Sequence, residues 1–269
     1  MATSAAVSKK VVSHDQWIAA RTEFLKKEKE FTRLRDEISK QRLELPWEKV
    51  EKNYVFEGPN GKESLADLFA GRSQLIVYHF MLGPDWVEGC PSCSFLGDHF
   101  DGAIPHLNAR DVTFLVISRA PYSQIQAFQK RMGWKFKWVS ANGNDFNFDY
   151  KVSFTPQDVA KGKEGEKNYN FNTIPFNVEE GPGASAFYKD ASGSVFHTYS
   201  TYARGLDIFL GAYNFLDIAP KGRDEDGLAF SMAWVKHHDK YTGSDVVDAQ
   251  RGYAPPAKTH DCCEKKENA

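Results

Sequence analysis

The stretch that decides the fold runs from residue 74 to residue 100 and reads QLIVYHFMLGPDWVEGCPSCSFLGDHF. Residues 74–82 form a continuous apolar run without alternation, which is typical of a strand buried on both faces of a sheet. Cys90 and Cys93 follow in the spacing C-x-x-C, and a helical pattern continues to about residue 108. The sequence therefore predicts a buried strand followed by a cysteine pair at the start of a helix.

A C-x-x-C pair at a helix start has the properties of a dithiol redox centre. The first sulfur lies among the unpaired N–H groups of the first turn, which stabilise thiolate over thiol. The second sulfur lies one turn further in, so it attacks the mixed disulfide only after the first has reacted. Pro91 suits the first turn, because its missing N–H would have no partner there. We interpret Cys90 as the attacking thiol and Cys93 as the resolving thiol.

Two other interpretations of the pair stay open at this point, half of a zinc site and two inert buried thiols. A structural zinc site needs four ligands, and this motif supplies two of them. The candidates for the other two stand at no recognised spacing; they are His79, His99, His106, Cys262 and Cys263. The redox interpretation is favoured, and it requires neither a metal nor a bound cofactor.

Composition limits the classes of partner and the compartment. The chain has 269 residues, with 34 basic and 36 acidic side chains and a net charge of -2. This balance gives no reason to expect nucleic acid or an anionic membrane as a partner. The sequence lacks an apolar run of the ~18 residues that a membrane span needs, and its N-terminus lacks the apolar core of a secretory signal. We therefore expect a cytoplasmic protein, where a close cysteine pair is more often catalytic or metal-binding than structural.

Residues 1–50 are expected to form an N-terminal helical extension. A helix is predicted over residues 13–43, with Ser13 and Gln16 as a capping box at its start. Apolar side chains recur on one face of this helix at spacings of three, four and seven; they are Trp17, Ala20, Phe24, Phe31, Leu34 and Ile38.

Residues 51–242 are expected to form the main domain. Apolar strands at 111–120 and 135–141 flank a helix at 122–134, which predicts a parallel or mixed sheet covered by helices. A polar insertion at about 141–182 precedes a hairpin at 184–202, a helix at 206–216 and a further helix at 228–238. Residues 243–269, which include Cys262 and Cys263, are expected to be a disordered tail.

The order of these elements is similar to that of thioredoxin-like proteins. The segments LPWEKV, SLADLFAGRSQLIVYHFM, GPDWVEGCPSCSF, DVTFLVISRAP and RMGWKFKWVSANGNDFNFDY more closely resemble a thioredoxin-like family catalogued as a domain of unknown function. Its members are described as dithiol-disulfide oxidoreductases. The resemblance covers roughly residues 11–242. It implies a thioredoxin-like α/β fold, with a central mixed sheet flanked by helices, a long N-terminal helix and a polar insertion before the C-terminal hairpin.

The resemblance also implies an activity and its partners. The expected reaction is thiol–disulfide exchange by a Cys90/Cys93 dithiol, with a disulfide-containing protein or small molecule as substrate and a thiol or a reductase as electron donor. Such proteins place a cis-proline opposite the first cysteine. Pro121, Pro175 and Pro182 could serve, and the position before the hairpin favours Pro182.

Four neighbours of the motif are candidates for supporting roles. Trp86, Asp85 and Glu88 precede the cysteines; the two acids could relay protons to the resolving thiol, with ordinary loop charges as the alternative. Arg119 follows a predicted strand and could stabilise a thiolate, with a structural ion pair as the alternative. Gly89 departs from the thioredoxin pattern, because thioredoxins carry a tryptophan at that position.

Two alternatives to thiol–disulfide exchange stay open. A peroxiredoxin-like thiol peroxidase places Thr or Ser three residues before its reactive cysteine, whereas Val87 stands there in this chain. The other alternative is a non-catalytic thioredoxin-like binding module whose cysteines only staple the motif.

Overall fold

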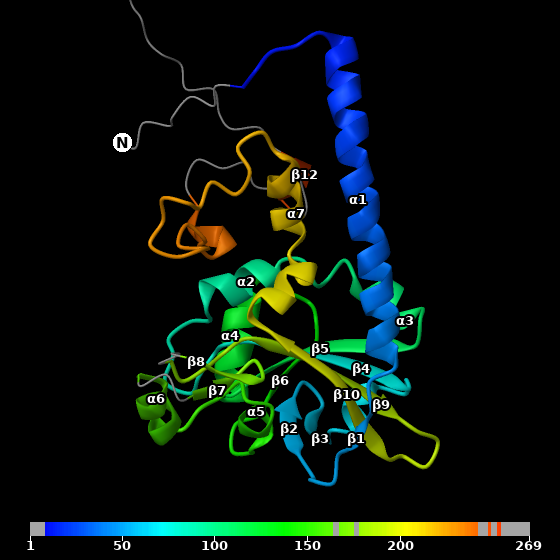
Figure 1. The fold of residues 1–269 in the computed structure, drawn as a ribbon. Helices are drawn as coiled ribbons and strands as arrows, with labels where there is room; N and C mark the ends of the chain where they lie inside the picture. The colour runs from blue at the N-terminus through cyan, green and yellow to red at the C-terminus, as the bar shows by residue number, and fades with distance from the viewer. Residues whose placement is uncertain (1–8, 164–166, 175–177, 242–246, 249–251, 254–269) are drawn as a thin grey trace, which may run out of the picture.

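A computed structural model describes residues 9–163, 167–174, 178–241, 247–248 and 252–253 of the chain. Its centre is an eight-stranded mixed sheet with the strand order β1-β10-β9-β4-β5-β6-β2-β3 (Figure 1). The strands are β1 (Glu48–Lys49), β2 (Val55–Gly58), β3 (Gly61–Ser64), β4 (Gln74–His79), β5 (Val112–Ser118), β6 (Trp138–Ser140), β9 (Gly183–Lys189) and β10 (Val195–Tyr202).

Strand β4 lies in the middle of this sheet and is followed directly by the cysteine pair. It pairs in parallel with β5 and antiparallel with β9, and β5 continues in parallel to β6. The helices after β4 and β5 are α2 (Pro91–Gly97), α3 (Ile104–Asn108) and α4 (Tyr122–Met132), and α7 (Gly211–Ile218) follows the β9–β10 hairpin. This order is the thioredoxin-like one, so the predicted fold is confirmed.

The continuous apolar run of β4 is explained by burial on both faces of the sheet. Tyr78 belongs to a core cluster that includes side chains of α2 and α4. Leu75 and Val77 point the other way, into a second cluster with Leu115 and Phe146. Alternate side chains of one strand thus enter two different cores, which requires apolar residues at nearly every position.

Three predicted helices differ from the structure. The stretch after the cysteines is broken into α2 and α3 by a turn, and residues 228–238 form bends and turns instead of a helix. The helix predicted at 206–216 is divided at Leu210 into a 3-10 helix (Ala203–Phe209) and α7. Glu225 gives the physical reason for the second difference. One of its carboxylate oxygens accepts hydrogen bonds from the Tyr213 hydroxyl, the Met232 N–H and the Trp234 indole. These bonds fold the segment back on itself, and a helix would break them.

The insertion at 141–182 has more structure than the sequence predicted. It contains α5 (Phe146–Asp149), α6 (Pro156–Lys163) and a two-stranded ladder of β7 (Lys167–Tyr169) and β8 (Asn172–Ile174). Tyr169, from β7, is buried with Val152, Phe154 and Tyr202 in a third core cluster. Buried aromatic residues hold the insertion against the β9–β10 hairpin, although its overall composition is polar.

Helix α1 (His14–Leu43) forms where the sequence predicted it and has the predicted Ser13–Gln16 capping box. It extends away from the sheet (Figure 1), and none of its residues is buried. Its apolar face, predicted from the spacing, therefore does not pack on the rest of the described chain. No helix in the described ranges combines the length and apolarity that crossing a membrane requires.

The tail lies mostly outside the described residues, and so do Cys262 and Cys263. Within it, β11 (Val247–Asp248) pairs antiparallel with β12 (Gly252–Tyr253). The expectation of disorder for residues 243–269 stays a prediction.

His79, at the end of β4, belongs to a chain of buried hydrogen bonds across the sheet. Its Nδ1 lies 3.3 Å from Asn147 Oδ1 and its Nε2 lies 2.9 Å from Ser185 Oγ. Ser185 contacts Ser200, whose hydroxyl lies 2.7 Å from His197 Nε2. Burial lowers the pKa of His79 to about 4, so the imidazole stays neutral near pH 7.

We predict that His79 makes the stability of the fold depend on acid pH. The unfolded histidine binds a proton below its ordinary pKa of 6.5, whereas the folded one does so only near 4. Because the unfolded chain binds more protons in this window, the free energy of unfolding falls as the pH drops from 6.5 to 4, by roughly 3 kcal/mol. In His79→Gln the loss between pH 7 and 4.5 should be clearly smaller, as measured by urea unfolding. His106→Gln, at an exposed histidine, is the control; an unchanged slope in His79→Gln would refute the assignment.

Candidate active site

The two cysteines are held at the carboxyl end of β4 by the backbone of Met81. The Cys90 N–H donates to the Met81 carbonyl at 3.1 Å, and the Met81 N–H donates to Cys93 Sγ at 3.5 Å. Cys90 is the N-cap residue of α2, and its carbonyl accepts bonds from both the N–H and the hydroxyl of Ser94 at 2.9 Å. The structure therefore places the pair at a strand end and a helix start, as the sequence predicted.

The environments of the two sulfurs differ. Cys90 is half-buried, and its pKa is lowered to about 7, chiefly by the hydrogen bond from the Cys93 thiol and also by the N–H groups of Cys93 and Ser92. Cys93 is 1% exposed, and burial together with the neighbouring Cys90 raises its pKa well above the ordinary value. Near pH 7 the Cys90 thiol is therefore partly ionised, while Cys93 stays protonated.

Tyr78 is a third member of the site that the sequence reasoning missed. Its hydroxyl lies close to the sulfur of Cys93, and this proximity favours the thiolate form of Cys93. The hydroxyl is fully buried and has no well-formed hydrogen bond to any residue of the described chain. Burial, and next the nearby Cys93, raise the pKa of Tyr78 well above 10. The sequence feature that could have indicated this role is the Tyr78 hydroxyl itself, a polar group within the apolar run of β4.

Pro182 directly precedes β9, at the edge of the sheet where β4 ends, but without the expected cis bond. The antiparallel β4–β9 register pairs His79 with Gly183. Continuing this register by one residue places Pro182 opposite Phe80, the residue that follows β4. The expectation of a cis-proline is wrong, because every peptide bond in the described part of the chain is trans. Of the other candidate prolines, Pro121 is the N-cap of α4, and Pro175 lies outside the described residues.

Tyr169 brings the insertion to this edge of the sheet. Its hydroxyl donates to the Pro182 carbonyl at 2.6 Å. Its pKa is raised, mainly by burial and in part by its electrostatic interaction with Cys93. Sequence reasoning could not place it, because the residue stands between two polar stretches.

Arg119 does not face a thiolate; it forms the structural ion pair that was the alternative. Its Nη2 lies 2.6 Å from Glu180 Oε1, and Glu180 is 1% exposed. The other carboxylate oxygen of Glu180 accepts a bond from Ser153 at 2.7 Å. Since Glu180 stands two residues before Pro182, this pair fixes the chain that enters β9.

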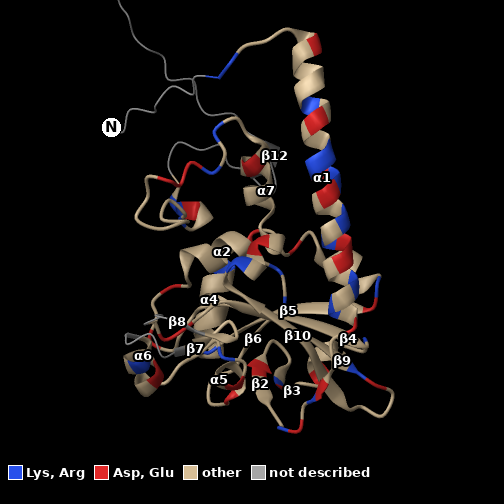
Figure 2. Ribbon diagram, in the orientation of Figure 1, with Lys and Arg blue, Asp and Glu red and all other residues tan. Residues whose placement is uncertain are grey.

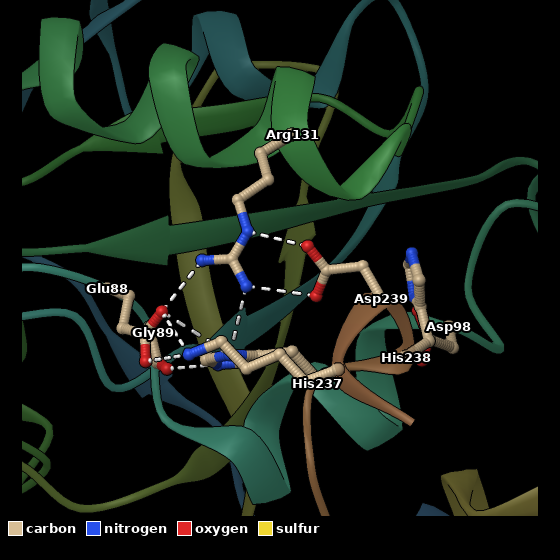
Figure 3. A network of polar contacts seen from close by, with 8 residues as sticks. Glu88, Gly89, Asp98, Arg131, His237, His238 and Asp239 are labelled. Carbon is tan, nitrogen blue, oxygen red and sulfur yellow. Dashed lines mark hydrogen bonds and ion pairs between the residues drawn. The ribbon is translucent and has the colours of Figure 1, made fainter. Parts of the chain in front are cut away.

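Glu88 is held in an ion-pair network that anchors the loop before Cys90 (Figure 3). Its carboxylate lies 2.6 Å from Lys240 Nζ and 2.7 Å from Arg131 Nη1, and these two partners hold its pKa at about 2. Such a carboxylate stays ionised and paired near neutral pH, and its expected role as a proton relay stays a prediction. His237 Nε2 donates to the Gly89 carbonyl at 2.7 Å, which ties the same loop to the C-terminal segment.

Packing explains why Gly89 stands before the first cysteine. A Cβ at this position would come within 2.6 Å of both Phe80 and Phe128, so a larger side chain would displace the loop. Trp86 packs against the edge of the first core cluster and accepts a bond from the Gln124 amide at its carbonyl. Asp85 is exposed, and its proposed part in proton transfer stays untested.

Among the described residues, no second pair of zinc ligands lies near the cysteines, and two of the candidates, Cys262 and Cys263, lie outside those residues. Across the described ranges, three or more histidine, cysteine or acidic side chains never gather as a metal site would require. His79 is engaged with Asn147 and Ser185, and His99 contacts the Phe95 carbonyl and the Ala212 N–H. His106 is exposed at the end of α3.

The solved structures similar to this chain include a peroxidoxin and peroxiredoxins, all at low sequence identity. A peroxidoxin, BcpB, from Mycobacterium tuberculosis is 11% identical with a TM-score of 0.41, over 62% of this chain and 94% of that one. Peroxiredoxin Q from Xanthomonas campestris is 17% identical with a TM-score of 0.37, over 59% and 88%. The mitochondrial 2-Cys peroxiredoxin from Plasmodium falciparum is 16% identical with a TM-score of 0.39, over 67% and 96%. Likeness at this level assigns no activity to the chain.

Comparison with families gives a clearer result than comparison with single proteins. None of the curated proteins matches the chain. One family model matches residues 6–241, which include α1, the whole eight-stranded sheet and the cysteine pair. The chain therefore belongs to the family described as "Bacterial protein of unknown function (DUF899)".

Proposed function

We propose that the chain is a thiol–disulfide oxidoreductase in which Cys90 attacks and Cys93 resolves. The observation that supports this most directly is the opposite shift of the two pKa values, lowered at Cys90 and raised at Cys93, at adjoining sulfurs. A nucleophile needs a pKa near the working pH. A resolving thiol must stay protonated until the mixed disulfide has formed.

The reaction transfers two electrons from the dithiol to the substrate. The Cys90 thiolate attacks one sulfur of the substrate disulfide and forms a mixed disulfide with it. The substrate S–S bond breaks, and the other substrate sulfur leaves as a thiolate that then takes up a proton. Cys93 then loses its proton and attacks Cys90 Sγ, which releases the second substrate thiol and leaves a Cys90–Cys93 disulfide. A small thiol or a reductase restores the dithiol.

Tyr78 supports the second of these steps. Once Cys90 is in a mixed disulfide, it no longer interacts with Cys93 as a thiolate, and the buried Cys93 must itself become one. The Tyr78 hydroxyl is the polar group on β4 that favours the ionised form of this sulfur. A hydroxyl that has no well-formed bond in the reduced protein is free to donate to the thiolate when it appears.

We predict unequal reactivity of the two thiols. Cys90 should alkylate with a midpoint near pH 7, while Cys93 should stay unmodified until the protein unfolds. Cys90→Ser should abolish exchange, and Cys93→Ser should stall as a mixed disulfide that dithiothreitol releases. Peptide mass spectrometry reads both results and separates this pair from Cys262 and Cys263. Equal alkylation of Cys90 and Cys93 with no trapped adduct would refute the mechanism.

Turnover with different oxidants separates the proposal from its alternatives. With dithiothreitol as donor, the protein should reduce a small aromatic disulfide much faster than it reduces hydrogen peroxide. The opposite preference would support the peroxidase alternative. No turnover with either, from protein whose Cys90 alkylates normally, would support a binding module.

We further predict that Tyr78→Phe slows resolution and leaves attack unchanged. A hydrogen bond to a charged group is worth about 1.5–3 kcal/mol, so release of the mixed disulfide should slow by roughly tenfold or more. The alkylation rate of Cys90 and the melting temperature should stay nearly the same, because the variant removes a buried hydroxyl without a good partner. Tyr54→Phe, at a buried tyrosine whose hydroxyl donates to Asp149, is the matched control. Equal resolution rates in both variants would exclude the role of Tyr78.

A further inference from the structure

Helix α1 carries an apolar stripe that the rest of the described chain leaves uncovered. Trp17, Phe24, Phe31 and Ile38 are 53%, 56%, 65% and 46% exposed. The helix is 30 residues long, and at 1.5 Å per residue it extends for about 45 Å. Single exposed apolar residues are ordinary, but a row of large ones along a helix marks an interaction surface.

The spacing of the stripe identifies the kind of partner. Trp17, Phe24, Phe31 and Ile38 repeat every seven residues, with Ala20 and Leu34 three positions after members of that series. A strict seven-residue repeat matches the 3.5-residue period of a left-handed coiled coil and drifts from the 3.6-residue period of a straight helix. In heptad terms the series occupies the a positions. The d positions are Ala20, Lys27, Leu34 and Gln41, and polar residues at such positions fix the register at some cost in stability.

The charges beside the stripe indicate a second copy of the same helix in parallel orientation. The g positions are Gln16, Glu23, Glu30 and Glu37, and the e positions are Arg21, Glu28, Arg35 and Arg42. In a parallel pair each g residue meets the e residue of the next heptad on the other helix, so Glu30 would meet Arg35 of a second copy. In an antiparallel pair glutamates would face glutamates and arginines would face arginines.

One contact of the parallel register is unfavourable, and the structure shows how it is reduced. Glu23 would meet Glu28 of a second copy, but Glu28 lies 2.7 Å from Arg21 of its own helix. Both signs of charge alternate along the whole of α1 (Figure 2), which differs from the basic face of a helix that binds anionic lipid.

The position of α1 leaves room for such a pair. It joins the sheet only at its C-terminal end, where the Arg42 guanidinium stacks 4.8 Å from the Tyr199 ring, and the rest of the helix projects outward (Figure 1). In a parallel dimer both main domains would hang from the same end of the paired helices. The stripe residues of two copies offer about 1,000 Å² of surface, which is the size at which specific interfaces begin.

We propose that α1 forms a parallel two-stranded coiled coil with α1 of a second copy, and that the protein is a homodimer through this helix. The proposal is independent of the chemistry assigned to the cysteines.

Sedimentation equilibrium on the full chain tests the proposal. We expect a dimer at micromolar concentration, and a monomer for Phe31→Asp, which places a charge in the seam. Thr22→Asp, on the outer f position of the same helix, should remain a dimer. Unchanged alkylation of Cys90 shows that each variant has folded. A monomeric parent chain, or a dimer that survives Phe31→Asp, would overturn the proposal.

A charge exchange tests the orientation. Glu30→Arg and Arg35→Glu should each weaken the homodimer, roughly tenfold in Kd, because like charges then meet at two equivalent contacts. Mixing the two variants should restore dimerisation, since both contacts become attractive again. A mixture no tighter than the separate variants would overturn the parallel pairing. If the parent chain is a monomer that sediments with phosphatidylglycerol vesicles, and Phe31→Asp abolishes this co-sedimentation, the dimer proposal is overturned. The apolar stripe would then bind a membrane surface instead of a second copy.

Discussion

Met81 binds both cysteines through its backbone, accepting a hydrogen bond from the Cys90 N–H and donating one to Cys93 Sγ. It stands two residues after β4, the strand that is paired on both sides and buried on both faces. The backbone at Cys90 and the sulfur of Cys93 are therefore both tied to the chain that leaves the central strand. The difference between the two thiols, on which the proposed exchange depends, follows from this placement, since one sulfur faces the helix start and the other faces the core.

The loop between β4 and α2 is held from a distant part of the chain. Gly89 allows the loop to lie flat on Phe80 and Phe128, and the carbonyl of Gly89 is bound by His237. Arg131 on α4 lies between Glu88 and Asp239 and joins the same two segments. The cysteine motif is thus clamped by residues near position 240, so a chain shortened to the sheet alone would lose the support of its own active-site loop.

The sequence allowed prediction of the features that depend on local patterns. The buried strand β4, the cysteine pair at a helix start and α1 with its capping box each rest on neighbours within a few residues. The missed features depend on contacts between distant residues. Hydrogen bonds to Glu225 fold residues 228–238 into turns despite their helical pattern. Arg119 pairs with Glu180 and not with a thiolate. The role of Tyr78 could not be predicted, because the sequence of an apolar strand does not show whether its tyrosine hydroxyl lies near carbon atoms or near a cysteine sulfur.

The bond from Tyr169 to the Pro182 carbonyl has a consequence for how this fold can be modified. The insertion contributes Tyr169 to the edge of the sheet where β4 ends, and this tyrosine donates a hydrogen bond to the residue that precedes β9. Removing residues 167–174 would leave that carbonyl without its donor and uncover Tyr202, whose ring packs against Tyr169. The insertion is therefore not a detachable module: a grafted or shortened version would need a new donor at the same place before the scaffold could accept it.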